Sequence, residues 1–113
     1  MVGSKYSIAY VVNAAAGAEG DFTAATIVAG RKFKLRKVTF VFPAGSGFQL
    51  QLYVKRGEEK VVPSEGYIVG DNSVVSIECE VEFESESSVV VHYKNADSAN
   101  AHSALVVLEG EVT

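Results

Sequence analysis

Apolar and polar residues alternate with a period of two along most of this chain, and no segment repeats its apolar residues with the spacing of a helix. Since successive side chains of a β-strand point to opposite faces, the alternation predicts strands with one apolar face. The strands recur about every ten residues, so eight or nine of them are predicted. They are expected at residues 6–12, 22–29, 33–42, 48–55, 60–62, 67–69, 74–84, 89–93 and 102–112.

Many short strands at regular intervals are typical of an all-β sandwich or barrel. Strands with one apolar face favour antiparallel pairing. We therefore predict an all-β fold: a single antiparallel β-sandwich, jelly-roll-like, although periodicity alone does not separate a plain sandwich from a jelly roll. The chain has 113 residues and no linker, composition break or internal repeat, so one domain is expected over residues 1–113.

The predicted strand 33–42 changes phase in its middle. Phe33 and Leu35 have one parity, whereas Val38 and the two phenylalanines that follow have the other. A β-bulge near Arg36-Lys37 would bring both groups to the core side.

The predicted strand 48–55 alternates without interruption. Its inward residues are expected to be Phe48, Leu50, Leu52 and Val54. The preceding segment "PAGSG" predicts a hairpin turn. Gln49, Gln51 and Tyr53 share the outer face, and amides beside an aromatic ring suit a sugar ligand, so carbohydrate binding is the alternative function.

The segment 76–86, "SIECEVEFESE", carries glutamates at alternate positions. Its apolar residues are expected to face the core, so the carboxylates form a straight row on the outer face, made by Glu78, Glu80, Glu82 and Glu84. A solvated surface is the simplest interpretation, and calcium binding is a second because calcium prefers oxygen ligands. Glycoside hydrolysis is not expected, since it needs two carboxylates that face each other across a substrate.

Half of the basic residues lie in the seven positions 31–37. Lys32, Lys34 and Arg36 share one face and match the spacing of the acidic row. If the two strands are neighbours, cross-strand pairs of roughly 0.2–1 kcal/mol each are expected. If the two rows lie on different surfaces, they suit contact between subunits, where complementary charge sets the orientation. Both rows together are the predicted interface.

The remaining candidates predict no chemistry. Cys79 is expected to be a small buried apolar residue, and His102 is expected to hydrogen-bond to the polar loop 95–100. Val90 and Val106 are expected to point outward and contact neighbours, and residues 14–18 are expected to form a loop or an arm. No catalytic signature is present in the sequence, so an enzyme is not expected, and neither a metal ligand set nor a cofactor is predicted.

Composition limits the partners. A net charge of −4 gives no electrostatic reason to bind nucleic acid or anionic lipid. No apolar run approaches the roughly 20 residues that span a membrane. The single cysteine excludes an intrachain disulfide. The N-terminus enters the alternating pattern without an apolar signal-peptide segment, so synthesis in a cytoplasm is expected.

The order of four segments gives a resemblance: "KVTFVFPAG", "FQLQLYV", "VVPSEGYIVGDNSVVSIE" and "SVVVHYKNADSANAHSALVVLEGE". With its Gly70-Asp71 turn before a long strand, its loop at 93–97 and its closing strand from His102, the segment 33–112 resembles small β-sandwich proteins of tailed phages and archaeal viruses, of the capsid-decoration or head- and tail-accessory type. The resemblance implies a non-enzymatic virion protein, made in the host cytoplasm, that assembles as a trimer or ring with other structural proteins. It implies no particular site residues.

Overall fold

The computed structural model describes residues 4–113, which form eight β-strands and contain no helix. The strands are β1 (Ser4–Ala14), β2 (Glu19–Thr26), β3 (Phe33–Phe42), β4 (Leu50–Arg56), β5 (Glu59–Val62), β6 (Ser73–Phe83), β7 (Ser88–Asn95) and β8 (His102–Val112). Over this range there is accordingly no helix that is long and apolar enough to cross a membrane.

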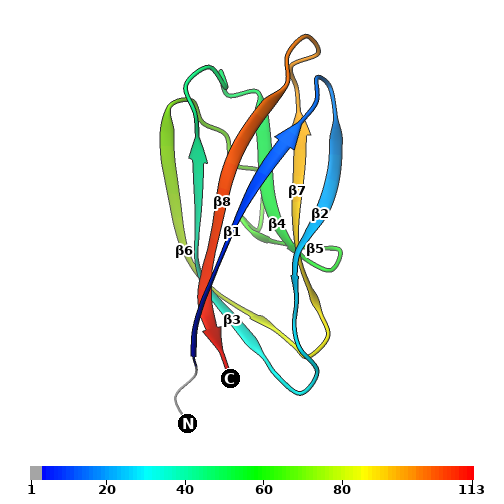
Figure 1. Cartoon of the computed structure of the whole chain (residues 1–113), viewed down its shortest axis with the longest axis vertical. Helices are drawn as coiled ribbons and strands as arrows, with labels where there is room; N and C mark the ends of the chain where they lie inside the picture. The colour runs from blue at the N-terminus through cyan, green and yellow to red at the C-terminus, as the bar shows by residue number, and fades with distance from the viewer. Residues whose placement is uncertain (1–3) are drawn as a thin grey trace.

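The strands form two antiparallel sheets of four strands each, which pack face to face (Figure 1). Sheet A has the order β1-β8-β3-β6, and sheet B has the order β2-β7-β4-β5. Every connection passes from one sheet to the other, except the tight hairpin between β4 and β5. This strand order, with the first strand paired to the last, is that of a jelly roll and confirms the predicted fold class.

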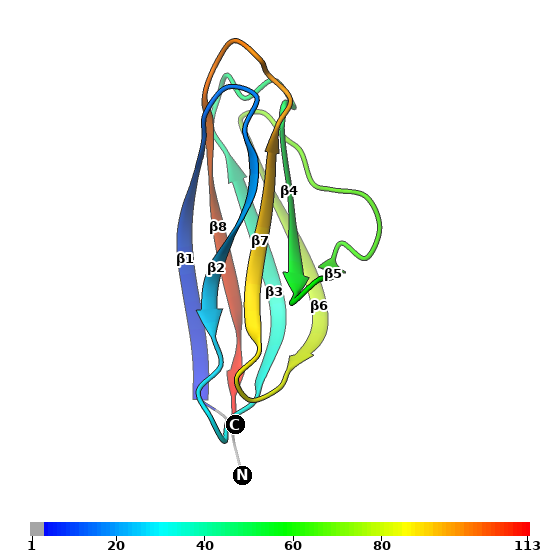
Figure 2. The same ribbon diagram turned by 90° about the vertical axis from the view of Figure 1, so that its right-hand side faces the viewer.

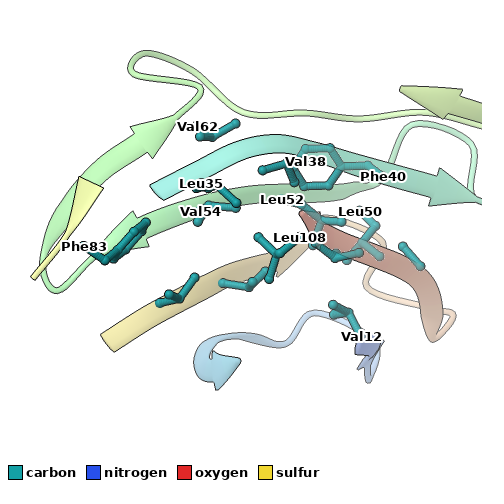
Figure 3. Packing of buried hydrophobic residues seen from close by; sticks show 14 of the residues in the cluster. Val12, Leu35, Val38, Phe40, Leu50, Leu52, Val54, Val62, Phe83 and Leu108 are labelled. Carbon is teal, nitrogen blue, oxygen red and sulfur yellow. The ribbon is translucent and has the colours of Figure 1, made fainter. Parts of the chain in front are cut away.

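The core lies between the sheets and is made by the inward residues of their strands (Figure 3). Its largest fully buried side chains are Phe33, Leu35, Phe40, Phe42, Leu50, Leu52, Phe83 and Leu108. Fully burying one such side chain contributes roughly 1.5–3 kcal/mol, so this layer is the main source of stability.

The predicted change of phase in β3 is confirmed. The register of β3 with both of its neighbours, β6 and β8, shifts between Leu35 and Lys37. As a result Phe33 and Leu35 on one side of the shift and Val38 on the other are all buried. The residue in between, Arg36, is exposed on the outer face.

Four expectations about the connections are wrong. Phe48 is 62% exposed, because β4 begins only at Leu50 and Phe48 lies in a turn with a left-handed backbone (φ 60°). The segment "PAGSG" is not a hairpin turn, since it joins β3 in sheet A to β4 in sheet B. The expected strand 67–69 is reduced to one bridge, between Leu52 and Ile68, in a segment that projects from the sandwich (Figure 2). The second strand begins at Glu19, earlier than expected.

Two further expectations are corrected by the pairing. Val106 does not point outward: it is fully buried, because β8 alternates so that Leu105 and Val107 take the outer positions. For residues 14–18 the expected loop is confirmed, and the alternative of an arm is wrong. Ala14 is buried at the end of β1, and the turn after it is held by a hydrogen bond from the Gly17 amide to the Asp97 carbonyl oxygen, 2.9 Å.

Candidate functional site

The outer face of sheet A brings the two predicted charge rows together. β3 lies between β6 and β8, so its basic residues are flanked by glutamates on both sides. We call this region the charged half; it comprises Lys5, Lys34, Arg36, Lys37, Glu78, Glu80, Glu82, Glu109 and Glu111. A groove of about 490 Å³ crosses it.

Ion pairs join the rows within the chain. The guanidinium of Arg36 lies 2.6 Å from Glu80 Oε1 and 3.3 Å from Glu111 Oε2. Lys32 Nζ lies 3.5 Å from Glu82 and 3.6 Å from Glu84, and these two carboxylates, Glu84 first, raise the pKa of Lys32. The rows are therefore neighbours, which is the first of the two predicted arrangements. They do not lie on different surfaces, and their contact with another subunit stays a prediction.

The other half of the same face carries an apolar row, next to which Thr39 and Ser76 are polar. The strand register aligns four residues, one from each strand, in a single row: Val11 pairs with Leu105, Leu105 with Val41, and Val41 with Val74. Val11 is 55% and Val74 is 64% exposed. The next row contains Ala9 and Val107. We call these six residues, Ala9, Val11, Val41, Val74, Leu105 and Val107, the apolar band.

The apolar band was missed in the sequence, although a signal was present. Runs such as "VTFVF" in β3 and "ALVVL" in β8 place apolar residues at consecutive positions. Such runs are typical of strands that are covered on both faces. In this structure the second face of these strands is the outer face of sheet A.

The outer face of sheet B carries a polar network around His92. The ring Nδ1 lies 2.6 Å from Asp21 Oδ1, and Nε2 lies 2.9 Å from Glu19 Oε2. Lys55 Nζ, on a nearly buried side chain, lies 2.8 Å from Asp21 Oδ2. Partial burial opposes ionisation of Asp21, but the hydrogen bonds from Lys55 and His92 outweigh it and lower the pKa of Asp21. Carboxylates lie within hydrogen-bond distance of both nitrogens of His92, so the orientation of its ring is fixed. The network depends on the pairing of β2 with β7, which sequence periodicity does not reveal.

The predicted ligand face is only partly open. Gln49 is exposed, while Gln51 and Tyr53 are half-buried. The Tyr53 ring stacks on His92 with centroids 4.5 Å apart, and Lys60 Nζ lies 4.3 Å from the centre of the Tyr53 ring. A sugar would have to compete with these contacts for the ring.

The remaining candidates have structural contacts. His102 Nε2 lies 2.9 Å from Asp97 Oδ2, which confirms the expected hydrogen bond to the loop 95–100. Cys79 faces inward but is only half-buried, because β6 is an edge strand, and burial raises the pKa of its thiol. Within residues 4–113, no group of three or more histidine, cysteine, aspartate or glutamate side chains is placed to hold a metal ion.

Comparison with known sequences gives no match: neither a family model nor a curated protein corresponds to this chain. Solved structures do share the fold. The capsid structure of Helicobacter pylori bacteriophage KHP30 contains a chain with a TM-score of 0.54 and 18% identity, over 97% of both chains. The PRD1 vertex protein P5 has a TM-score of 0.57 and 12% identity, over 98% of both chains.

A third similar structure belongs to an archaeal virus. A chain of Sulfolobus Turreted Icosahedral Virus has a TM-score of 0.60 and 14% identity; 99% of the present chain aligns to 30% of the viral chain. At these identities the similarity concerns the fold. The resemblance to β-sandwich structural proteins of phages and archaeal viruses is thereby confirmed at the level of the fold.

Proposed function

We propose that this protein is a non-enzymatic structural component of a virus particle, of the capsid-decoration or head- and tail-accessory type. The observation that supports this most is the extent of the structural similarity. The chain aligns over 97% of both chains with a chain of a bacteriophage capsid and over 98% of both chains with the PRD1 vertex protein P5.

The proposed partners are other copies of this chain and other structural proteins of the same particle. A trimer or ring is the assembly that the resemblance implies. In this proposal the charged half of sheet A sets the orientation of the contact, because complementary charges favour one docking register over others. The particle is the proposed location, after synthesis in the host cytoplasm.

Two measurements test this function. Native mass spectrometry and sedimentation over a wide concentration range should show a discrete oligomer, and a monomer at the highest concentration would contradict self-association. Peptide mass spectrometry of purified particles from the same source should detect the chain at a fixed ratio to the major capsid protein. Its absence from intact particles would contradict the virion role.

Carbohydrate binding through Gln49, Gln51 and Tyr53 stays a prediction. The Tyr53 ring already contacts His92 and Lys60, so a sugar would have to displace these side chains to stack on it. A glycan array with the purified protein tests it directly.

A further inference from the structure

We infer that the outer face of sheet A is the surface through which two copies of this chain associate, with the apolar band of one copy packed against the apolar band of the other. The inference rests on the proposed function, in which the protein self-associates. It adds which surface two copies share and that their contact is two-fold symmetric.

The first argument is the shape of the surface. The pairing register of the four strands of sheet A places one apolar residue of each strand in a single row: Val11, Leu105, Val41 and Val74. Ala9 and Val107 extend the row by one position along the strands. The result is an apolar row that crosses the whole sheet, and another sheet face can cover such a row, as in sheet-on-sheet packing about 10 Å apart.

The second argument is area. Four strands about 4.8 Å apart, each about eleven residues long, give the whole outer face of sheet A an area of about 700 Å². A stable interface of standard size covers about 800 Å² on each partner. The apolar band occupies less than half of the face. A stable contact therefore has to include the charged half as well as the band.

The third argument is charge. The charged half contains both signs, with basic residues on β3 between acidic residues on β6 and β8. A partner of one sign, such as a nucleic acid, would meet repulsion from one set. A second copy of the same face offers both signs. When β3 of one copy lies opposite β6 or β8 of the other, one strand spacing away from β3, its basic residues face acidic ones.

The fourth argument is the contrast with sheet B. The outer face of sheet B is occupied by the network of Glu19, Asp21, Lys55 and His92. An apolar band that packs against the same band of a second copy makes an isologous contact, with the same residues on both copies. Such a contact closes on two copies, and it can also link trimers or rings in pairs.

A pair of matched variants tests the surface. Val11→Lys combined with Val74→Lys places two charges in the apolar band, while Val28→Lys places one at a valine that is 71% exposed but lies in the loop after β2. We expect the double variant to raise the dissociation constant by about 100-fold or more, measured by sedimentation, and Val28→Lys to leave it unchanged. Circular dichroism should show that both variants fold.

The outcomes separate this inference from the proposed function. If the unmodified protein associates and the double variant associates equally well, the surface is wrong while the structural role stands. If the unmodified protein is monomeric at every concentration, this inference and self-association are overturned, while the content of purified particles still decides the virion role.

Crosslinking gives a second test that needs no charged substitution. In a Cys79→Ala background, single cysteines at Ala9, Thr39 and Ser76 sample the outer face of sheet A, and Thr23→Cys on sheet B is the control. With a short bismaleimide, at least one of the first three should give a covalent dimer and the control should not. Dimers at Thr23 alone, or at none of the four positions in a protein that associates, would overturn the inference.

Discussion

Asn95 joins three segments of the chain at one end of the sandwich. It is buried, and its side-chain amide donates to the carbonyl oxygens of Ala14, Ala15 and Asn100, at 3.3, 3.1 and 2.9 Å. Its Oδ1 accepts from the backbone amide of Asp97 at 3.0 Å. The β1–β2 turn and the β7–β8 loop are thus held by one polar side chain.

We predict that Asn95→Ala lowers the free energy of unfolding by about 2–3 kcal/mol, because it leaves buried carbonyl groups without a donor. Urea unfolding followed by circular dichroism measures the change. The matched control is Asn13→Ala, at an exposed position of β1, which should change stability by less than about 0.5 kcal/mol. Equal effects of the two substitutions would show that the hydrogen bonds of Asn95 are not needed.

The lowered pKa of Asp97 makes the stability of the fold depend on pH. Hydrogen bonds from the Ala99 amide, His102 and Asn100 lower the pKa of Asp97 from 3.8 to about 2. The folded state therefore binds this proton less readily than the unfolded chain does. The stabilisation is present above pH 3.8 and is lost as the pH falls towards 2.

We predict that the urea midpoint of Asp97→Asn falls less steeply between pH 4 and pH 2 than that of the unmodified protein, because the substituted amide does not titrate over the window set by these pKa values. Glu65→Gln, at an exposed position after β5, is the control and should retain the full slope. A slope for Asp97→Asn equal to that of Glu65→Gln would contradict the assignment.

At this scale, alternation predicted well which way a side chain points. It placed Phe83 inside and Glu82 outside, and it linked His102 to the polar loop. It failed at Phe48, because a left-handed backbone in a turn breaks the two-residue period, and no periodic signal reports that conformation. It also did not anticipate that Lys55, in an outward phase, is covered and paired with Asp21.

Among the elements, β3 connects the charge rows because it lies between two acidic strands. Arg36 and Glu80 are both substantially exposed, so their pair is worth about 0.2–1 kcal/mol. We predict that Arg36→Glu and Glu80→Arg each lower stability by about this amount. In urea unfolding, the double variant should recover the part of the loss that comes from the pair with position 80, while the carboxylate at position 36 still faces Glu111.

The double variant also separates two roles. It keeps the pair within the chain but reverses the charges that a second copy would meet, so it should weaken association while stability recovers. A double variant as unstable as the sum of the two single variants would show that the pair does not stabilise the fold.

The bounds of β3 and β8, and the change of phase in β3, could be predicted because long alternating runs with clear ends determine them. The partners of each strand could not. Alternation indicates which side chains of a strand face inward, but it does not indicate to which sheet the strand belongs. The contact of Asp21 with His92 and the row from Val11 to Val74 both depend on pairing between strands that are far apart in sequence.

For the whole molecule, the pairing of β1 with β8 brings the two ends of the described chain together. Ser4 is the register partner of Val112, so β1 begins at the pole of the sandwich where β8 ends (Figure 1). The exposed turn at Gly57 and Glu58, between β4 and β5, lies within the one hairpin that stays in a single sheet.

We predict that a circular permutant folds to the same structure when Thr113 is joined to Ser4 by a short Gly-Ser linker and the chain is opened between Gly57 and Glu58, because neither change removes a sheet contact. Far-ultraviolet circular dichroism and the urea midpoint measure this. The control opens the chain between Val106 and Val107, inside a central strand, and should not fold cooperatively. Two equally stable permutants would contradict the central role of β8.

The irregular register at Arg36 has a consequence for how this gene can change. Substitutions at Arg36 alter a surface charge, but loss of its codon would restore strict alternation through β3. Phe33 and Leu35 would then be in phase with Val38, so both groups would still face the core without a bulge. Descendants of this sequence should therefore accept many residue types at this position and should also tolerate its loss.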